Sequence, residues 1–225
     1  MTTMPPKTLG FIHTSATLVP VFQQLAAEHL PGVETFHISD DSLIKDVIRR
    51  NELTPLTAKR VAQHVASAEA AGADFILVTC SSIGRAVEAA AAEAKVPVLR
   101  VDQPMADAAV RSGRRIGVIA TLPTTLDPTA DLIRRRAKAA ARDVEITERL
   151  CEGAFAALMC GDGATHDAAV AAALRELSSS CDVVVLAQAS MARVADALSP
   201  SEKPVPVLSS PALAVKHLAS VLLAS

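Results

Sequence analysis

The chain has almost no aromatic residues, with five Phe, no Trp and no Tyr among 225 residues. It therefore lacks the rings on which single-stranded nucleic-acid bases stack. It also lacks an excess of positive charge, because 22 basic and 24 acidic side chains give a net charge of −2. A surface for binding a polyanion is not indicated, and we expect no nucleic-acid partner.

Long apolar runs and targeting signals are missing as well. No uninterrupted apolar stretch approaches the roughly 18 residues of a membrane-spanning helix. Residues 1–10 lack the basic and apolar regions of a secretory signal. These absences predict a soluble, cytoplasmic protein with no membrane partner.

Neither a metal site nor a nucleotide site is indicated. The four cysteines are Cys80, Cys151, Cys160 and Cys181. They have no CxxC spacing, and no His lies at the intervals typical of a zinc site. The nine glycines form neither GxGxxG nor GxxxxGK[ST]. We expect reduced cysteines, no metal and no cofactor.

The chain does contain a regular alternation of short apolar runs with Ala-rich segments. The Ala-rich segments, such as 56–71 and 164–179, have apolar residues at helical spacing. The expected strands are 8–13, 33–38, 74–79, 97–101, 115–120, 143–148, 182–187 and 204–208. Strands that alternate with helices predict an α/β fold with parallel sheets and helices on both faces.

The second half of the chain repeats the first. Residues 74–99 align with 182–208, and 9–26 align with 116–133. The repeat predicts two pseudo-symmetric lobes, each a small doubly wound parallel sheet. The alternative is a single continuous sheet whose βα units merely look alike.

The predicted lobes have their boundary where the repeat begins again. We expect lobe one to comprise 1–101 plus 210–225, and lobe two to comprise 102–209. The hinge would lie near 102–114, and the apolar tail would form a helix that packs back on lobe one. An active site is expected in the cleft between the lobes.

Four loops follow predicted strands and precede predicted helices, where ligands bind in parallel α/β sheets. They are 14–17, 80–82, 121–125 and 188–190, and all are rich in hydroxyl groups or small residues. Helix-start N–H groups and hydroxyls suit a small carboxylate, so the predicted binding residues are Thr14, Ser15, Ser81, Ser82, Thr121, Thr124 and Ser190. The simpler alternative is that Thr14, Ser15, Ser81 and Thr124 only cap helices.

Cys80 is the main candidate for chemistry. It ends an apolar strand and precedes a helix start, where N–H donors and the helix dipole lower a thiol pKa from about 8.5. It could then act as a base or a nucleophile. The run from Cys80 to Arg85 resembles the phosphate loop of Cys-dependent phosphatases, but it has four intervening residues instead of five. That difference argues against phosphatase chemistry.

Five segments together carry a family pattern. They are GFIHTSAT at the N-terminus, VTCSSIG (78–84), VPVLRVDQPMADAAV (96–110), RIGVIATLPTTLDPT (115–129) and VVVLAQASMARV (183–194). The pattern resembles the aspartate/glutamate/hydantoin racemase superfamily. The resemblance implies two lobes, a cofactor-independent site between them and a homo-oligomer. It also implies two cysteines, one per lobe, that remove and return a proton on opposite faces of an α-carbon.

This chain has only the first of those cysteines. Cys80 matches it, whereas the repeat places Gln188 at the second position. A Gln amide cannot carry a proton as an acid or base, but it can hydrogen bond to a carboxylate or an oxyanion. His13 is the alternative proton carrier, and His37 is a weaker one. We expect His64, His166 and His217 to be ordinary surface or packing residues.

Several activities are therefore compatible with the sequence. The leading hypothesis is racemisation or isomerisation of a small carboxylate-bearing compound, with Cys80, Gln188 and His13 as catalytic residues. Decarboxylation of the arylmalonate decarboxylase type is the main alternative. A non-catalytic carboxylate-binding protein that has lost the second thiol is the other.

Overall fold

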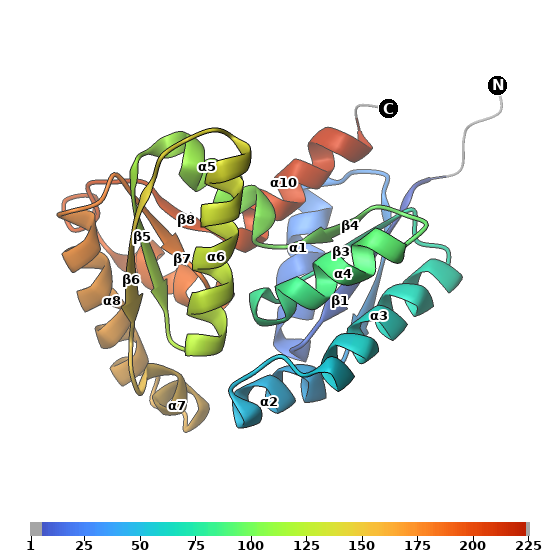
Figure 1. Cartoon of the computed structure of the whole chain (residues 1–225), viewed down its shortest axis with the longest axis horizontal. Coiled ribbons are helices and arrows are strands. Elements are labelled where there is room, and N and C mark those ends of the chain that lie inside the picture. The colour runs from blue at the N-terminus through green and yellow to red at the C-terminus, as the bar shows by residue number, and fades with distance from the viewer. Residues whose placement is uncertain (1–5, 224–225) are drawn as a thin grey trace. The chain divides into compact units, whose positions relative to one another are not determined.

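The computed structural model describes residues 6–223 and consists of two compact units (Figure 1). Unit 1 runs to Val101 and resumes at Pro211, and unit 2 is Asp102–Ser210. Each unit contains its own four-stranded parallel sheet. Within the described residues, no helix is both long and apolar enough to cross a membrane.

Unit 1 has the strand order β2-β1-β3-β4. Its strands are β1 (Thr8–His13), β2 (Glu34–Ser39), β3 (Phe75–Val78) and β4 (Val98–Arg100). Its helices are η1 (Ala16–Leu18), α1 (Val19–His29), α2 (Asp41–Arg50), α3 (Pro55–Ala70), η2 (Ser81–Ile83), α4 (Gly84–Glu93) and α10 (Ser210–Leu222). All pairings are parallel, so every carboxyl end of a strand lies at the same sheet edge.

Helices cover both faces of this sheet, as the continuous apolar runs of the central strands require (Figure 1). On one face, Ile12 and Ile76 pack with α2, α3 and α4. On the other face, Phe11 and Leu77 pack with α1 and α10. The C-terminal helix therefore packs on the first unit, as the apolar tail predicted.

Unit 2 repeats this arrangement with the strand order β6-β5-β7-β8. Its strands are β5 (Arg115–Ala120), β6 (Glu145–Leu150), β7 (Val183–Leu186) and β8 (Val207–Ser209). Its helices are α5 (Gln103–Ser112), α6 (Pro123–Ala139), α7 (Ala154–Met159), α8 (Gly163–Ser178), η3 (Ala189–Met191) and α9 (Ala192–Ala197). The helices α7, α8 and α9 share a core on one face of the sheet, and α5 and α6 pack on β7 and β5.

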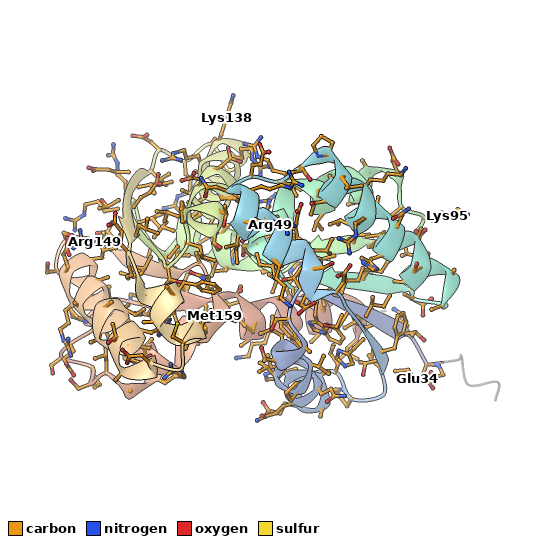
Figure 2. All side chains as sticks on the ribbon, turned by 90° about the horizontal axis from the view of Figure 1, so that it is seen from below. Glu34, Arg49, Lys95, Lys138, Arg149 and Met159 are labelled. Atoms are coloured by element: carbon orange, nitrogen blue, oxygen red, sulfur yellow. The ribbon has the colours of Figure 1, made fainter. Side chains whose placement is uncertain are left out.

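Exposed side chains of unit 2 are mainly polar. Lys138, near the end of α6, extends away from the ribbon, and Arg149 lies on the edge strand β6 (Figure 2). Arg149 pairs with Glu176 of α8 at 2.8 Å. Such exposed pairs contribute little stability, but charges on an edge strand oppose pairing with another sheet.

In both units an aspartate hydrogen bonds to the backbone at the start of the first strand. Asp74 accepts a hydrogen bond from the Thr8 backbone N–H at 2.8 Å. Asp182 accepts bonds from the backbone N–H groups of Arg114 and Arg115 at 2.9 and 2.8 Å. The two carboxylates therefore accept hydrogen bonds from backbone N–H groups at or just before the start of β1 and β5.

The predicted fold class is confirmed. All eight expected strands form, and β1 and β5 have the predicted bounds. The single-sheet alternative is wrong, because the strands divide between two separate sheets. Helices α2 and α7 were not expected, and residues 224–225 of the predicted tail helix lie outside the described residues.

Close packing in unit 2 requires a glycine at the centre of β5. A Cβ on Gly117 would lie 2.9 Å from Leu177 Cδ1 and 3.2 Å from Cys181 Sγ. We expect Gly117→Ala to lower the free energy of unfolding by about 1–3 kcal/mol, because overpacked cores must shift. Urea unfolding measures this difference.

Gly163→Ala is the matched control for that experiment. Its Cβ would meet only Arg193 Nη2, at 3.8 Å, and the residue begins α8 without a positive φ. We expect this variant to be as stable as the wild type or slightly more stable. Equal losses in the two variants would contradict the packing argument.

Candidate active site

The four predicted loops lie at the carboxyl ends of the two central strands of each unit. Cys80 follows β3 and Gln188 follows β7, and each is the N-cap of a 3₁₀ helix. Their backbones match, with φ, ψ of −137°, 118° and −130°, 138°. The repeat therefore presents two different side chains from equivalent positions of two equivalent scaffolds.

The capping alternative for the loop hydroxyls is wrong. No side-chain capping bond is made at the starts of η1, η2 or α6. Ser15 is at the N-cap position of η1, but its Oγ bonds to Thr17 Oγ1 at 2.8 Å instead. The Thr124 Oγ1 atom is buried and has no partner. The helix-start N–H groups of these loops thus remain without side-chain caps.

Cys80 is a half-buried cysteine, outside any disulfide, at the sheet edge of unit 1. Its side chain packs against the core cluster that contains Ile12 and Val78. Ser81 and Ser82, which follow it, are buried at 6% and 5% exposure. The thiol therefore lies next to small polar groups and ahead of two consecutive helical segments, η2 and α4.

Arg100 is a buried charge near this loop that the sequence analysis missed. Its side chain is 1% exposed and donates to Glu88 at 2.6 Å. A Cβ on Gly84 would lie 2.3 Å from Arg100 Cζ, so the guanidinium packs directly on the first residue of α4. The signal in the sequence was an Arg at the end of the apolar strand PVLRV.

His13 is fully buried, with both ring nitrogens engaged. Nδ1 lies 2.8 Å from Thr79 Oγ1, and Nε2 lies 2.8 Å from His37 Nδ1. The Thr79 hydroxyl donates to the Ile12 carbonyl at 3.3 Å. The Thr79 oxygen must therefore accept from His13 Nδ1–H, and His13 Nε2 must accept from His37 Nδ1–H. His13 is thus neutral and has no nitrogen directed to a substrate.

The surroundings of His13 favour this neutral form. Its ring stacks on His37 at a centroid distance of 5.1 Å and on Phe11 at 5.9 Å, and Phe22 tilts against it. Burial, with the nearby His37, lowers the pKa of His13 to about 4. Burial also lowers the pKa of His37. The pair supports the strand end before Cys80 and does not resemble an exposed acid or base.

Gln188 is held in one orientation by Thr121. Its Oε1 accepts from the Thr121 backbone N–H at 2.6 Å and from the Thr121 hydroxyl at 2.9 Å. A backbone N–H can only donate, so the oxygen of the amide must face Thr121. The Nε2 hydrogens then point away from Thr121. Gln188 offers two donors to its surroundings and no proton that it could transfer.

Unit 2 contains a second buried histidine that the sequence analysis assigned to surface or packing. His166, in the first turn of α8, has a side chain that is 0% exposed. Its Nδ1 lies 2.8 Å from Asp167 Oδ1, and its Nε2 has no partner. Asp167 also pairs with Arg193 of α9. Among the described residues, no three His, Cys, Asp or Glu side chains form a group that could hold a metal ion.

A family model decides the relationship of this chain to known proteins. The model for Asp/Glu/Hydantoin racemase matches residues 9–218. The chain belongs to this racemase family. The predicted family and the predicted racemase type of enzyme are thereby confirmed. No curated protein sequence matches the chain.

Solved structures of racemases share the fold at low sequence identity. An allantoin racemase from Klebsiella pneumoniae is 20% identical, with a TM-score of 0.71 over 97% of this chain and 88% of its own. A glutamate racemase from Francisella tularensis in complex with D-glutamate is 16% identical, with a TM-score of 0.75 over 98% and 82%. An aspartate racemase from Picrophilus torridus is 14% identical, with a TM-score of 0.68 over 97% and 93%.

For a member of the racemase family, the two units are chemically unequal. Unit 1 presents a thiol at Cys80, and unit 2 presents an oriented amide at Gln188. The repeat aligns Thr14 with Thr121, and both are buried at 4% exposure. Each unit thus has a buried threonine directly after its first strand, whereas the loop after its third strand carries an ionisable Cys80 in unit 1 and a neutral Gln188 in unit 2.

The His13–His37 pair predicts a loss of stability at acidic pH. The pKa of His13 is about 4 in the folded protein and 6.5 in the unfolded chain, so the folded protein binds this proton only at a lower pH. The contribution of His13 to the free energy of unfolding is therefore fully present above pH 6.5 and is lost as the pH falls toward 4. At pH 4.5 we expect a loss of about 2–3 kcal/mol from this residue relative to pH 7.

His13→Asn isolates that effect, because an amide N–H can still donate to Thr79 but does not titrate. Urea unfolding midpoints at pH 7 and pH 4.5 should differ less in the variant than in the wild type. The same pH-dependent loss in both proteins would show that His13 is not the group responsible.

Proposed function

We propose that this protein is a cofactor-independent racemase or isomerase of a small carboxylate-bearing compound, with Cys80 as its thiolate base or nucleophile. The observation that carries the proposal is a cysteine outside any disulfide at the carboxyl end of β3, directly before a helix start, in a chain of the racemase family. A soluble, cytoplasmic homo-oligomer is part of the proposal and is supported by the family resemblance.

The local structure of unit 1 favours a thiolate at Cys80. Helix-start N–H groups stabilise a negative charge, and those of η2 receive no side-chain cap. The repeat places Thr14 as Thr121 is placed in unit 2, so the Thr14 N–H and hydroxyl are proposed to donate to the sulfur. Ser81 and Ser82 add hydroxyl groups at the same loop.

Gln188 is proposed to bind the substrate carboxylate. Thr121 holds its oxygen, so the amide hydrogens are the groups that can meet a ligand. When the α-proton leaves, negative charge develops on the carboxylate as an enediolate, and preoriented donors stabilise that charge. Thr121 is therefore a positioning residue in this proposal and not a direct ligand of the substrate.

The remaining hydroxyl residues are proposed to complete the carboxylate site. Thr124 is the best supported, because its buried Oγ1 has no partner in the chain. Ser190 lies in η3, two residues after Gln188. Ser15 could donate only by giving up its bond to Thr17. His13 is not retained as the proton carrier, since both of its nitrogens are bonded.

Deuterium exchange tests the reaction directly. The enzyme is incubated in deuterated water with the enantiomers of glutamate and aspartate, followed by chiral chromatography and mass spectrometry. Racemisation places deuterium at the stereogenic carbon of the compound and forms its mirror image. Cys80→Ser should lower the rate by about 100-fold or more, because an alcohol is a far weaker acid than a thiol.

Cys160→Ser is the matched control, since Cys160 is the exposed free cysteine. We expect full activity in that variant. Arylmalonate decarboxylation with deuterium only in the product would replace the racemase proposal with a decarboxylase. Carboxylate binding without turnover or exchange, unchanged by Cys80→Ser, would indicate a binding protein.

The orientation of Gln188 gives a separate prediction for substrate affinity. Gln188→Glu should raise KM about 10- to 100-fold, because a carboxylate replaces two donors and repels the substrate anion. Thr121→Val should raise KM by a smaller factor, as the backbone N–H still holds the amide. Thr121→Ser keeps the hydroxyl and should behave like the wild type. Unchanged KM in Gln188→Glu would exclude carboxylate binding by this residue.

A further inference from the structure

Arg100 is a buried charge in unit 1 that the proposed reaction does not use. Its side chain is 1% exposed, which places it among the largest fully buried side chains of the described residues. Burial of an ionised group is costly, so a buried guanidinium calls for an explanation. Arg100 Nη1 donates to Glu88 Oε1 at 2.6 Å, but the Glu88 side chain is 34% exposed. The positive charge therefore lies inside the protein, whereas Glu88 stays in contact with solvent.

The register of the sheet places Arg100 beside the Cys80 loop. Arg100 is the partner of Val78 in the pairing of β3 with β4, and Cys80 follows two residues after Val78. Side chains two residues apart on an extended chain share a face of the sheet. Val78, Cys80 and Val98 all pack in the core that α4 covers. Arg100, two residues after Val98, therefore lies on the same face of unit 1 as Cys80.

Gly84 shows where the guanidinium of Arg100 ends. A Cβ on Gly84 would lie 2.3 Å from both Arg100 Cζ and Arg100 Nη2. The guanidinium therefore occupies the space that a side chain would need on the first residue of α4. Gly84 directly follows η2, and Cys80 is the N-cap of η2. The charge thus packs on the backbone of the two helical segments that begin at the thiol.

The two charges of the Arg100–Glu88 pair are not equivalent at this loop. Glu88 is one helical turn further along α4 than Gly84, on which the guanidinium packs. Solvent also screens the partly exposed carboxylate more strongly than the buried guanidinium. The positive charge is therefore closer to the start of η2 and less screened, so it outweighs the negative charge there.

Other ionisable groups lie around the loop, on the elements that pack against it or continue from it. They are the same in every variant described below, so differences between the variants report only Arg100 and Glu88. These groups are Asp40, Asp41, Arg60 and His64 around the start of α2, His13 at the end of β1, Arg85 on α4 and Asp102 after β4.

We propose that Arg100 is a positioning residue of the reaction proposed above, on which this inference rests, and that its buried guanidinium holds the Cys80 sulfur in the thiolate form. A positive charge in the interior stabilises a nearby thiolate, because the attraction between them is only weakly screened. The N–H groups at the helix start act in the same direction. In this role Arg100 transfers no proton and acts only through Cys80.

The pH dependence of Cys80 alkylation tests this assignment in the full chain without a substrate. Iodoacetamide reacts with the thiolate, and peptide mapping by mass spectrometry gives the rate at Cys80 across the pH range. The exposed Cys160 is an internal reference in the same samples. For the wild type we expect a midpoint about one pH unit or more below the free-thiol value of about 8.5. Arg100→Met should raise that midpoint by about one unit.

Glu88→Gln distinguishes an electrostatic role from a merely structural one. It weakens the same ion pair but leaves the positive charge in place, so the midpoint at Cys80 should fall by about half a unit. A structural pair would give shifts of the same sign in Arg100→Met and Glu88→Gln, because both lose a contact between β4 and α4. Arg100→Lys keeps the charge and should stay within about half a unit of the wild type.

Arg50→Met is the matched control. Arg50 also pairs with a carboxylate of unit 1, Asp46 at 2.9 Å, but it ends α2 and therefore lies away from the start of that helix. We expect the wild-type midpoint in this variant. A midpoint that does not rise in Arg100→Met, or does not fall in Glu88→Gln, would overturn the assignment. If Arg100→Met does not fold, Glu88→Gln and Arg100→Lys decide the question in the same way.

Turnover separates this inference from the proposed function. With the enantiomers of glutamate and aspartate in deuterated water, Arg100→Met should exchange the α-hydrogen about tenfold more slowly at pH 7 and recover most of that loss at pH 9. If the wild type exchanges neither compound while the alkylation midpoints shift as expected, the racemase proposal fails for these compounds and the role of Arg100 stands. Exchange by the wild type with unshifted midpoints in the variants would support the racemase proposal and overturn the role of Arg100.

Discussion

The parallel pairing of β1 with β3, and of β5 with β7, is the constraint on which the chemistry of both units depends. The ladders continue beyond the assigned strands, since the Thr79 N–H donates to Ile12 and the Ala187 N–H donates to Ile119 at 2.9 and 3.0 Å. This register brings the loop after the first strand beside the loop after the third. In unit 2 it allows Thr121 to reach Gln188 across 67 residues of sequence.

The repeat shows how one scaffold can hold different chemistry at equivalent positions. The backbones of Cys80 and Gln188 have nearly the same φ and ψ, and each begins a 3₁₀ helix that leads into an α-helix. The scaffold therefore fixes where a side chain projects but not what it does. Gln188 takes its role from the donors of Thr121, because these leave only amide hydrogens for a ligand.

The sequence was sufficient for the fold because apolar runs and helical spacing repeat with little interruption. It was also sufficient for the equivalence of Cys80 and Gln188, which follows from alignment alone. It could not show that Thr121 holds Gln188, since that bond depends on strand register. Nor could it place His166, because an Ala-rich helix has small residues on every side and its buried stripe is indistinct. Hydroxyl residues before helices indicated caps, yet the structure has none at η1, η2 or α6.

The two buried histidines show that burial alone does not assign a role to a titratable group. Both ring nitrogens of His13 are hydrogen bonded, one to Thr79 and one to His37. Protonation of His13 must therefore break one of these hydrogen bonds. His166 bonds to the Asp167 carboxylate through one nitrogen, and its other nitrogen is buried without a partner. The first arrangement resists protonation and stabilises the strand ends of unit 1. The second joins the start of α8 to Asp167 and, through Asp167, to Arg193 of α9.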